Sequence, residues 1–201
     1  MSRGIIVLDA GHGRFGNPYP IMENIYEDTQ NYKLACRLKA CLEAKGFTVL
    51  LTRERVEDDP SLEARGRLAG DVGACLFLSL HSNAPGSATP PHVYHTVRGS
   101  EVYYSLADEP RNAEIAYALN TAVVETMGTV DRGIKTRSYP DNPRVNYYSV
   151  LRHTAAYGCP TALLIEHGFH TNPEDSAFLQ SIECLQKLAK IEADVIDDFF
   201  R

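Results

Sequence analysis

The strongest constraint on the fold lies near the start of the chain, where a short apolar run leads directly into a glycine-rich turn. Residues 5–8 are Ile-Ile-Val-Leu, and residues 9–13 are Asp-Ala-Gly-His-Gly. A continuous, largely β-branched run is typical of a strand buried on both faces of a sheet. Open α/β sheets bind ligands beyond the carboxyl ends of their strands. His12 is therefore the first candidate for a metal ligand, because the glycines on either side let a ligand approach the backbone closely.

Apolar runs and helical periodicities alternate along the rest of the chain. Further strands are predicted at residues 47–52, 75–80 and 161–166, with an edge strand at residues 101–104. Helices are predicted at residues 27–45 and 111–127, from Asp59 and Pro173 onward, and over the last twenty residues. This alternation predicts an α/β fold with a twisted, mostly parallel central sheet, mixed at its edge, and helices on both faces.

One long segment, residues 129–146, shows no clear periodicity and is predicted to be irregular. Loops of this length are uncommon unless they line a site. The basic and aromatic side chains that it carries are Arg132, Lys135, Arg137, Tyr139 and Arg144.

Composition indicates one globular domain over residues 1–201, because no linker or low-complexity run divides the chain. No run is long enough to span a membrane. The net charge of −6, without basic clusters, makes nucleic acid an unexpected partner. Since no basic or apolar leader precedes the first strand, we expect synthesis in the cytoplasm without a signal peptide. The five cysteines are scattered and odd in number, which argues against a complete disulfide framework.

Ionisable side chains stand at the ends of three predicted strands and at the start of a helix. His12, His81 and Glu166 follow separate strands, and Glu27 begins the helix. If the strands lie side by side, these four side chains converge on one edge of the sheet. Two imidazoles and one carboxylate are the protein ligands of an open catalytic zinc site, and a further carboxylate can act as the base for an attacking water.

Six short blocks match, in order, the motifs of a known enzyme family. The blocks are residues 7–13, Glu27 with Asn31, residues 79–84 (Ser-Leu-His-Ser-Asn-Ala), residues 131–135 (Asp-Arg-Gly-Ile-Lys), residues 150–152 (Val-Leu-Arg), and residues 165–169 (Ile-Glu-His-Gly-Phe) with residues 171–173. With these blocks the chain resembles the zinc-dependent N-acetylmuramoyl-L-alanine amidases of phage endolysins and bacterial cell-wall hydrolases. The resemblance extends from Ile5 to about Asp175.

The resemblance implies one Zn²⁺ per chain, held by His12, Glu27 and His81, with Glu166 as the catalytic carboxylate. The substrate would be peptidoglycan or muramyl peptides, cut at the amide between the muramic acid lactyl group and L-alanine. The place of action would be the cell wall, reached by phage-type or mother-cell lysis or as a domain of a longer exported protein. We expect substrate contacts from Asn83 and Arg152, because an amide can bond the peptide backbone and a guanidinium can hold a carboxylate at two points.

Several alternatives remain at this level. Glu23, one helical turn before Glu27, is a rival ligand. Asp9 is expected to brace the turn or to hydrogen-bond His12, and His167 to be structural, with its side chain on the opposite sheet face from Glu166. His92 and His95, in a proline-rich loop, are candidates for substrate contact. Two other functions compete: a zinc peptidase acting on another peptide, and a catalytically inactive wall-binding module.

Overall fold

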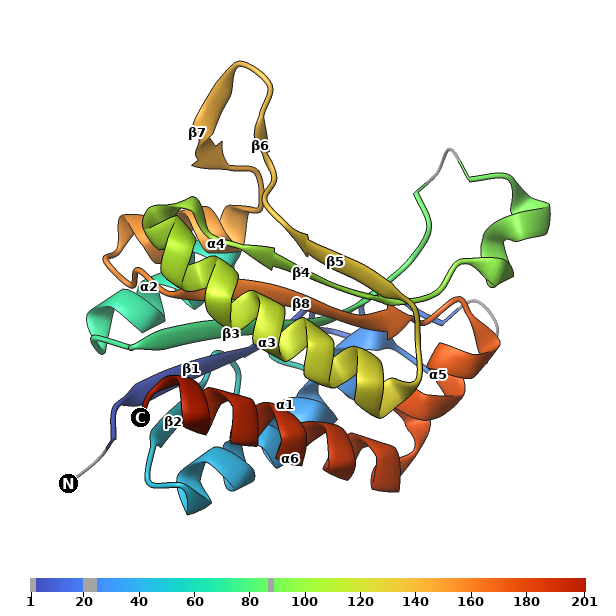
Figure 1. The fold of residues 1–201 in the computed structure, drawn as a ribbon, viewed down its shortest axis with the longest axis horizontal. Coiled ribbons are helices and arrows are strands. Elements are labelled where there is room, and N and C mark those ends of the chain that lie inside the picture. The colour runs from blue at the N-terminus through green and yellow to red at the C-terminus, as the bar shows by residue number, and fades with distance from the viewer. Residues whose placement is uncertain (1–2, 20–24, 87–88) are drawn as a thin grey trace.

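A six-stranded sheet forms the centre of the computed structural model, which describes residues 3–19, 25–86 and 89–201 (Figure 1). Its strands are β1 (Ile5–Ala10), β2 (Thr48–Leu51), β3 (Leu76–Asn83), β4 (Ser100–Tyr104), β5 (Asp131–Lys135) and β8 (Ala162–Phe169). Their order is β2-β1-β3-β8-β4-β5. The first four strands in this order are parallel, whereas β4 runs antiparallel to β8 and parallel to β5. The predicted mostly parallel sheet, mixed toward one edge, is confirmed.

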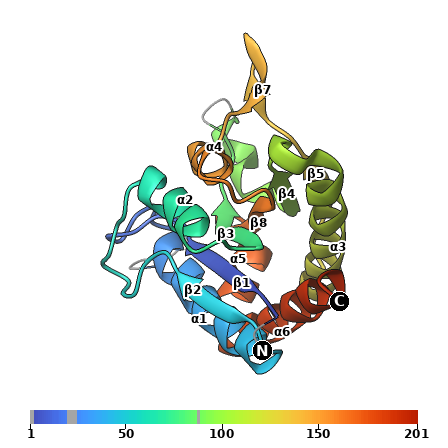
Figure 2. The ribbon, with the colours of Figure 1, turned by 90° about the vertical axis from the view of Figure 1, so that its left-hand side faces the viewer.

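Helices cover both faces of this sheet (Figure 2). One face carries α1 (Glu27–Ala44), α3 (Glu109–Met127) and α6 (Ile182–Phe199). The other carries α2 (Leu62–Asp71) and α4 (Ser149–Ala156), while α5 (Pro173–Gln180) follows β8. Two 3₁₀ helices, η1 (Pro91–Thr96) and η2 (Leu106–Asp108), flank β4. No helix in these described ranges has the length and apolar character needed to cross a lipid bilayer.

The apolar runs of the central strands supply two separate layers of core. In β1, Ile6 and Leu8 face the side covered by α1, α3 and α6, whereas Val7 packs with Phe77 beneath α2 and α4. Successive side chains of a strand point to opposite faces. A strand covered on both sides must therefore be apolar at every position, which explains why these runs were recognisable.

The prediction that residues 129–146 are irregular was wrong. They form β5 and then a hairpin of β6 (Ser138–Tyr139) and β7 (Asn142–Asn146), which protrudes from the body in Figure 1. The prediction that residues 101–104 form an edge strand was also wrong, because β5 pairs with the outer side of β4. These strands are mostly half-buried or exposed, so they lack the apolar signal of the central strands.

Two glycines of α2 allow its backbone to touch the segment that contains α4. A Cβ atom on Gly66 would lie 2.5 Å from the backbone nitrogen of Thr154, and one on Gly70 would lie 2.0 Å from the backbone oxygen of Tyr157. Real Cβ atoms do not approach backbone this closely. The close spacing of α2 and α4 therefore depends on hydrogen at both positions.

Candidate metal centre

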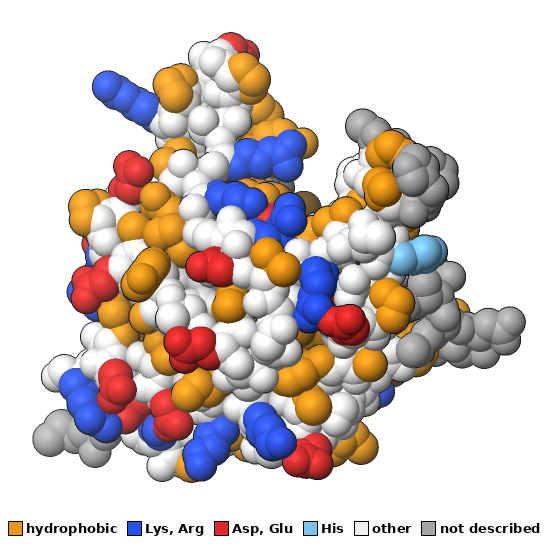
Figure 3. Space-filling view, turned by 45° about the vertical axis from the view of Figure 1, so that its right-hand side comes forward, with side chains coloured by type: hydrophobic (Ala, Val, Ile, Leu, Met, Phe, Trp, Pro, Cys, Tyr) orange, Lys and Arg blue, Asp and Glu red, His pale blue; other side chains and the backbone are white. Residues whose placement is uncertain are grey.

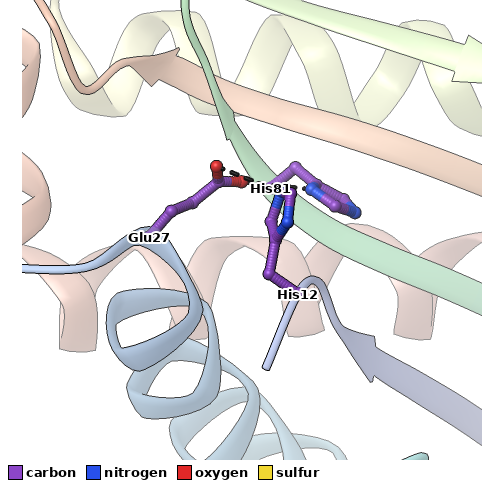
Figure 4. Close-up of side chains that lie close together, drawn as sticks. All are labelled: His12, Glu27 and His81. Carbon is purple, nitrogen blue, oxygen red and sulfur yellow. Dashed lines mark hydrogen bonds and ion pairs between the residues drawn. The ribbon is translucent and has the colours of Figure 1, made fainter. Parts of the chain in front are cut away.

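Three side chains from separate elements point at one another beyond the carboxyl ends of β1 and β3 (Figure 4). His12 follows β1, Glu27 is the first residue of α1, and His81 lies in β3. One potential ligand atom from each lies within 4.8 Å of the others. His12 Nε2 is 3.2 Å from Glu27 Oε2, and His81 Nδ1 is 3.1 Å from Glu27 Oε1. The convergence predicted from the strand ends is therefore present.

The turn after β1 has an unusual backbone conformation at His12. The φ angle of His12 is 61°, in the left-handed region that few non-glycine residues adopt. A Cβ atom on the preceding Gly11 would lie 2.2 Å from the His81 ring. The glycine therefore leaves the space that the His81 imidazole occupies, and it lets the two rings lie 5.0 Å apart between centroids.

Two buried arginines hold the carbonyl groups of this turn. Arg65 Nη2 donates to the backbone oxygen of His12 at 2.8 Å, and Arg53 Nε donates to that of Ala10 at 3.0 Å. Arg65 is fixed in turn by Asp9, at 2.9 Å. Sequence reasoning missed both arginines, because nothing in their local pattern distinguishes them from surface residues. Their long side chains reach the turn from distant parts of the chain.

Asp9 braces the turn, which was one of the two roles expected for it from the sequence. Besides Arg65, its carboxylate accepts hydrogen bonds from Thr52 Oγ1 and Ser79 Oγ, both at 2.6 Å. Burial alone would raise the pKa of Asp9, but the Arg65 charge and these hydrogen bonds outweigh it, so the pKa lies below its ordinary value. The buried group therefore stays a carboxylate that anchors Arg65.

The carboxylate of Glu27 is buried and fully engaged, with 1% of the residue exposed. Oε1 accepts hydrogen bonds from the Ser82 backbone nitrogen at 3.0 Å and from Asn31 Nδ2 at 3.2 Å, and Oε2 accepts one from Asn17 Nδ2. Burial alone would raise the pKa of Glu27, but hydrogen bonds with the two imidazoles outweigh burial and hold the pKa well below its ordinary value. An anionic oxygen pair facing two imidazoles suits a metal ligand. Glu23, the rival, lies outside the described residues.

Glu166 lies beside this group without being part of it. It is paired directly with His81 across β8 and β3, so the two side chains share one face of the sheet. Its Oε2 atom is buried, with no hydrogen-bond partner in the described part of the chain. Burial, together with the nearby charges of Glu27 and Glu101, raises the pKa of Glu166 well above its ordinary value. A half-buried carboxyl with an unused oxygen is suited to exchanging a proton.

The imidazoles and Glu166 open onto one cleft of about 260 Å³. Its lining residues are His12, Leu62, His81, Tyr148, Ser149, Val150, Leu164 and Glu166. The walls come from the N-terminal ends of α2 and α4, and the floor from the sheet. Leu62, 51% exposed, gives one wall an apolar rim. A substrate in this cleft would lie between the two helices.

The residues present fit a zinc ion. Two imidazoles and one carboxylate, held by three elements, are a donor set typical of catalytic zinc, which keeps a position open for water or substrate. Glu166 lines the same cleft as the two imidazoles, and its buried Oε2 atom has no hydrogen-bond partner among the described residues. The arrangement can therefore hold a metal and place a separate carboxyl group next to it.

The two residues expected to contact substrate have other partners. Asn83 Nδ2 donates to Glu101 Oε1 at 3.0 Å. Arg152 Nη1 donates to the backbone oxygens of Asn146 and Tyr147, at 2.9 and 3.1 Å, at the base of the hairpin. Neither residue lines the cleft described above, so their contacts with substrate stay predictions.

The other histidines have varied environments. His167 projects to the opposite sheet face, where its Nε2 lies 2.7 Å from Glu192 Oε1 of α6, so its structural role is confirmed. His95 Nδ1 lies 3.0 Å from the Thr171 backbone oxygen and ties down the loop. The side chain of His92 lies outside what the structure describes. His170, given no role by the sequence, is stacked on Tyr19 and has its Nδ1 3.9 Å from Glu27 Oε2.

Comparisons with known proteins identify a family for this chain. A family model described as N-acetylmuramoyl-L-alanine amidase matches residues 6–198. The amidase LytC of Bacillus subtilis is 28% identical over 197 residues, covering 98% of this chain and 35% of LytC. The catalytic domain of CwlV, an amidase from Bacillus (Paenibacillus) polymyxa var. colistinus, has a TM-score of 0.78 at 27% identity, covering 99% of this chain and 98% of that one. Cwp6 from Clostridium difficile has a TM-score of 0.84 at 25% identity, covering 98% of this chain and 29% of Cwp6. The chain thus spans about a third of LytC and nearly all of the CwlV catalytic domain.

Proposed function

This chain belongs to the N-acetylmuramoyl-L-alanine amidase family, and from that premise we propose that it hydrolyses the amide between the lactyl group of N-acetylmuramic acid and L-alanine in peptidoglycan. The observation that carries the proposal is the grouping of three candidate metal ligands, His12, Glu27 and His81, next to Glu166, which lines one cleft with the two imidazoles. Oε2 of Glu166 has no hydrogen-bond partner among the described residues. We propose further that residues 1–201 act as one catalytic domain and that the chain works on the cell wall.

In this scheme the ligand set holds one Zn²⁺. When bound there, the ion supplies Lewis-acid polarisation of the amide carbonyl and a lower pKa for water at the site. Glu27 remains ionised because its hydrogen bonds hold its pKa low. The second layer of contacts, from Arg53 and Arg65 to the turn and from Asn31 to Glu27, keeps the ligands in place before substrate arrives.

Glu166 moves the proton. Its Oε2 atom accepts a proton from the water that attacks the carbonyl carbon, and the carboxylic acid then gives that proton to the alanine nitrogen as the C–N bond breaks. The structural support is that Glu166 lines the cleft and that this oxygen, which is buried, has no hydrogen-bond partner among the described residues. Burial and the neighbouring negative charges raise its pKa, which makes the carboxylate a stronger base for the water proton and lets the carboxylic acid hold that proton until the C–N bond breaks.

The cleft favours an extended chain as substrate. Its walls are the first turns of α2 and α4, with Leu62 on one side and Val150 on the other. Apolar side chains at these positions suit the methyl groups of the lactyl unit and of alanine.

The two competing functions predict different outcomes. An inactive wall-binding module has no need for a carboxyl group beside grouped metal ligands. Against it stand the three grouped candidate ligands and the Oε2 atom of Glu166, which has no partner among the described residues. A general zinc peptidase would cleave a peptide whether or not it carries muramic acid. We propose the amidase because the whole described fold, and not only the ligands, is that of the family.

The deciding experiment is turnover of purified peptidoglycan by the zinc-loaded protein, with products identified by mass spectrometry. We expect free stem peptides that begin at L-alanine, loss of activity with a chelator and recovery with zinc. A muramyl peptide and the same peptide without muramic acid are then compared. Cleavage of both would favour the peptidase, and an intact wall would contradict the proposed function.

A further inference from the structure

A second charged cluster lies beside the metal centre, on the outer strands of the same sheet face. Glu101 of β4 is paired directly with Glu166 of β8, so the two carboxylates project from the same face. Glu101 is buried, with 3% exposure. The groups that reach its carboxylate are Asn83 Nδ2 at 3.0 Å, the Tyr103 hydroxyl at 2.9 Å, Arg132 Nε at 2.8 Å, and Lys135 Nζ.

A bulge in β5 brings both basic residues to this one carboxylate. Arg132 and Lys135 are three positions apart, and side chains at that separation in a regular strand point to opposite faces. The pairing of β4 with β5 shifts register opposite Glu101, where Gly133 has a left-handed φ of 78°. The extra residue returns Lys135 to the face used by Arg132. Both cations therefore reach Glu101 Oε2.

The guanidinium of Arg132 is held at one end and free at the other. Its Nε atom donates to Glu101, and its Cζ atom lies 4.9 Å from the centre of the Phe169 ring. Neither Nη atom hydrogen-bonds to any residue in the described ranges, and 33% of the side chain is exposed. A guanidinium fixed in this way presents its two terminal nitrogens as a fork, the geometry that binds a carboxylate at two points.

The cluster also keeps a surplus of positive charge. One cation is enough to neutralise Glu101, yet Arg132 and Lys135 both contact it, and the Lys135 side chain is 36% exposed. Figure 3 shows basic side chains gathered beneath the protruding hairpin. Surplus positive charge beside a cleft draws in an anionic group.

The position of the fork matches the length of a wall peptide. Neighbouring strands lie about 4.8 Å apart, which puts β5 roughly 10 Å from Glu166, and its basic side chains lean back toward Glu101 on the strand between them. Each residue of an extended peptide spans at most about 3.5 Å. A carboxyl group on the residue that follows L-alanine therefore reaches roughly 5–7 Å beyond the scissile nitrogen.

We propose that Arg132, with Lys135 beside it, binds a free carboxylate on the residue that follows L-alanine, and that this contact makes the enzyme prefer acidic stem peptides. The proposal rests on the proposed amidase function. It differs from the sequence-based prediction of carboxylate binding by Arg152, whose Nη1 atom donates to the carbonyl groups of Asn146 and Tyr147.

The test uses two muramyl tripeptides whose second residue is acidic and is joined to the third residue through its side-chain carboxyl. The α-carboxyl of this second residue is free in one tripeptide and a carboxamide in the other. We expect the zinc-loaded wild-type protein to cleave the acid with a kcat/KM roughly tenfold or more above that of the amide. In Arg132→Gln this ratio should fall to about one, and Arg132→Lys should restore part of it, because the charge returns without the fork. Calorimetric titration with the acid and amide product peptides should show the same loss of preference in binding.

Two further variants serve as controls. Arg144→Gln removes a positive charge from an exposed position in β7 and should keep the wild-type ratio. Arg152→Gln should also keep it, although removal of the hairpin contacts lowers stability. Because each ratio is measured within one variant, a general loss of folded protein cancels.

Two outcomes would overturn the proposal: equal cleavage of acid and amide by the wild type, and an unchanged ratio in Arg132→Gln. If the ratio is unchanged while cleavage of both tripeptides falls equally, Arg132 only stabilises Glu101. If the preference is lost in Arg152→Gln instead, the carboxylate is assigned to Arg152. Failure of the wild type on purified peptidoglycan as well as on both tripeptides would instead remove the proposed function itself.

Discussion

Glu166 and His81 are paired directly across β8 and β3, so that an imidazole of the proposed ligand set and a carboxyl group project side by side from one face of the sheet. Oε2 of that carboxyl group has no hydrogen-bond partner among the described residues. The register of two parallel strands fixes the relative position of these two side chains, which therefore does not depend on the conformation of a loop. The first two predictions separate the roles of the two residues.

Glu166→Gln should abolish turnover and leave zinc bound. The amide has nearly the shape of the carboxyl but cannot take a proton from water, so we expect kcat to fall by about 10²- to 10⁴-fold. Metal content by mass spectrometry and turnover of peptidoglycan are measured on the same preparation. A variant that loses its zinc, or one that remains fully active, would show that Glu166 does not have this role.

His81→Ala should lose the metal. With one of three protein ligands removed, stoichiometric zinc should not survive dialysis. Zinc should raise the melting temperature of the wild type but not of the variant, since a ligand present at about 1,000 times its Kd adds roughly 4 kcal/mol of stability. His95→Gln, in the loop next to α5, is the matched control and should keep its zinc. Retained zinc in His81→Ala would mean that the ligand set is wrong.

Asp9→Asn should destabilise the protein at neutral pH and matter less in acid. The folded pKa of Asp9 lies below the ordinary value of 3.8, so its contribution is fully present above the unfolded pKa and is lost as the pH falls through the folded pKa. Breaking its buried pair with Arg65 should cost about 3 kcal/mol at pH 7. Urea denaturation at about pH 7 and pH 3 measures this. Asp141→Asn, on the exposed hairpin, is the control, and a difference that does not change with pH would contradict the assignment.

Gly66→Ala should force α2 and α4 apart. The added methyl group would meet the backbone of Thr154 at 2.5 Å, and overpacking of this kind typically costs about 1–3 kcal/mol. Because the same helices form the walls of the cleft, kcat/KM should fall as well. Gly86→Ala, where a Cβ atom meets nothing within 4 Å, is the control and should be close to neutral. Unchanged stability in Gly66→Ala would mean that the helices can move without strain.

The central strands and the convergence of His12, His81 and Glu166 at one edge of the sheet could be predicted from the sequence for a physical reason. Strands buried on both faces carry unbroken apolar runs, and β1, β3 and β8 each contain one before their polar carboxyl ends. Parallel neighbours bring their carboxyl ends to one edge, so the residues that follow them had to converge. The roles of Glu27 and Glu166, in contrast, came from the resemblance to a family, because both are carboxylates at the end of an element.

The rest could not be predicted because it depends on contacts between distant residues. The strand β5 is half-exposed and polar, so its pattern resembles a loop. The helix α4 has eight residues, too few to establish a periodicity. Arg53 and Arg65 look like ordinary surface residues in the sequence, yet both are 2% exposed and hold the turn after β1. Only the fold reveals where such long side chains end.

The left-handed turn at His12 has a consequence for how metal is acquired. His12, Arg14, Phe15 and Asn17 all have positive φ angles, a conformation that costs roughly 1 kcal/mol or more for most residues. The hydrogen bonds of the two arginines offset that cost as the chain folds, and not when an ion arrives. Little conformational entropy then remains to be lost on binding, so we expect zinc to enter a ready-made site quickly, in one kinetic phase, and with an affinity that reflects its ligands alone.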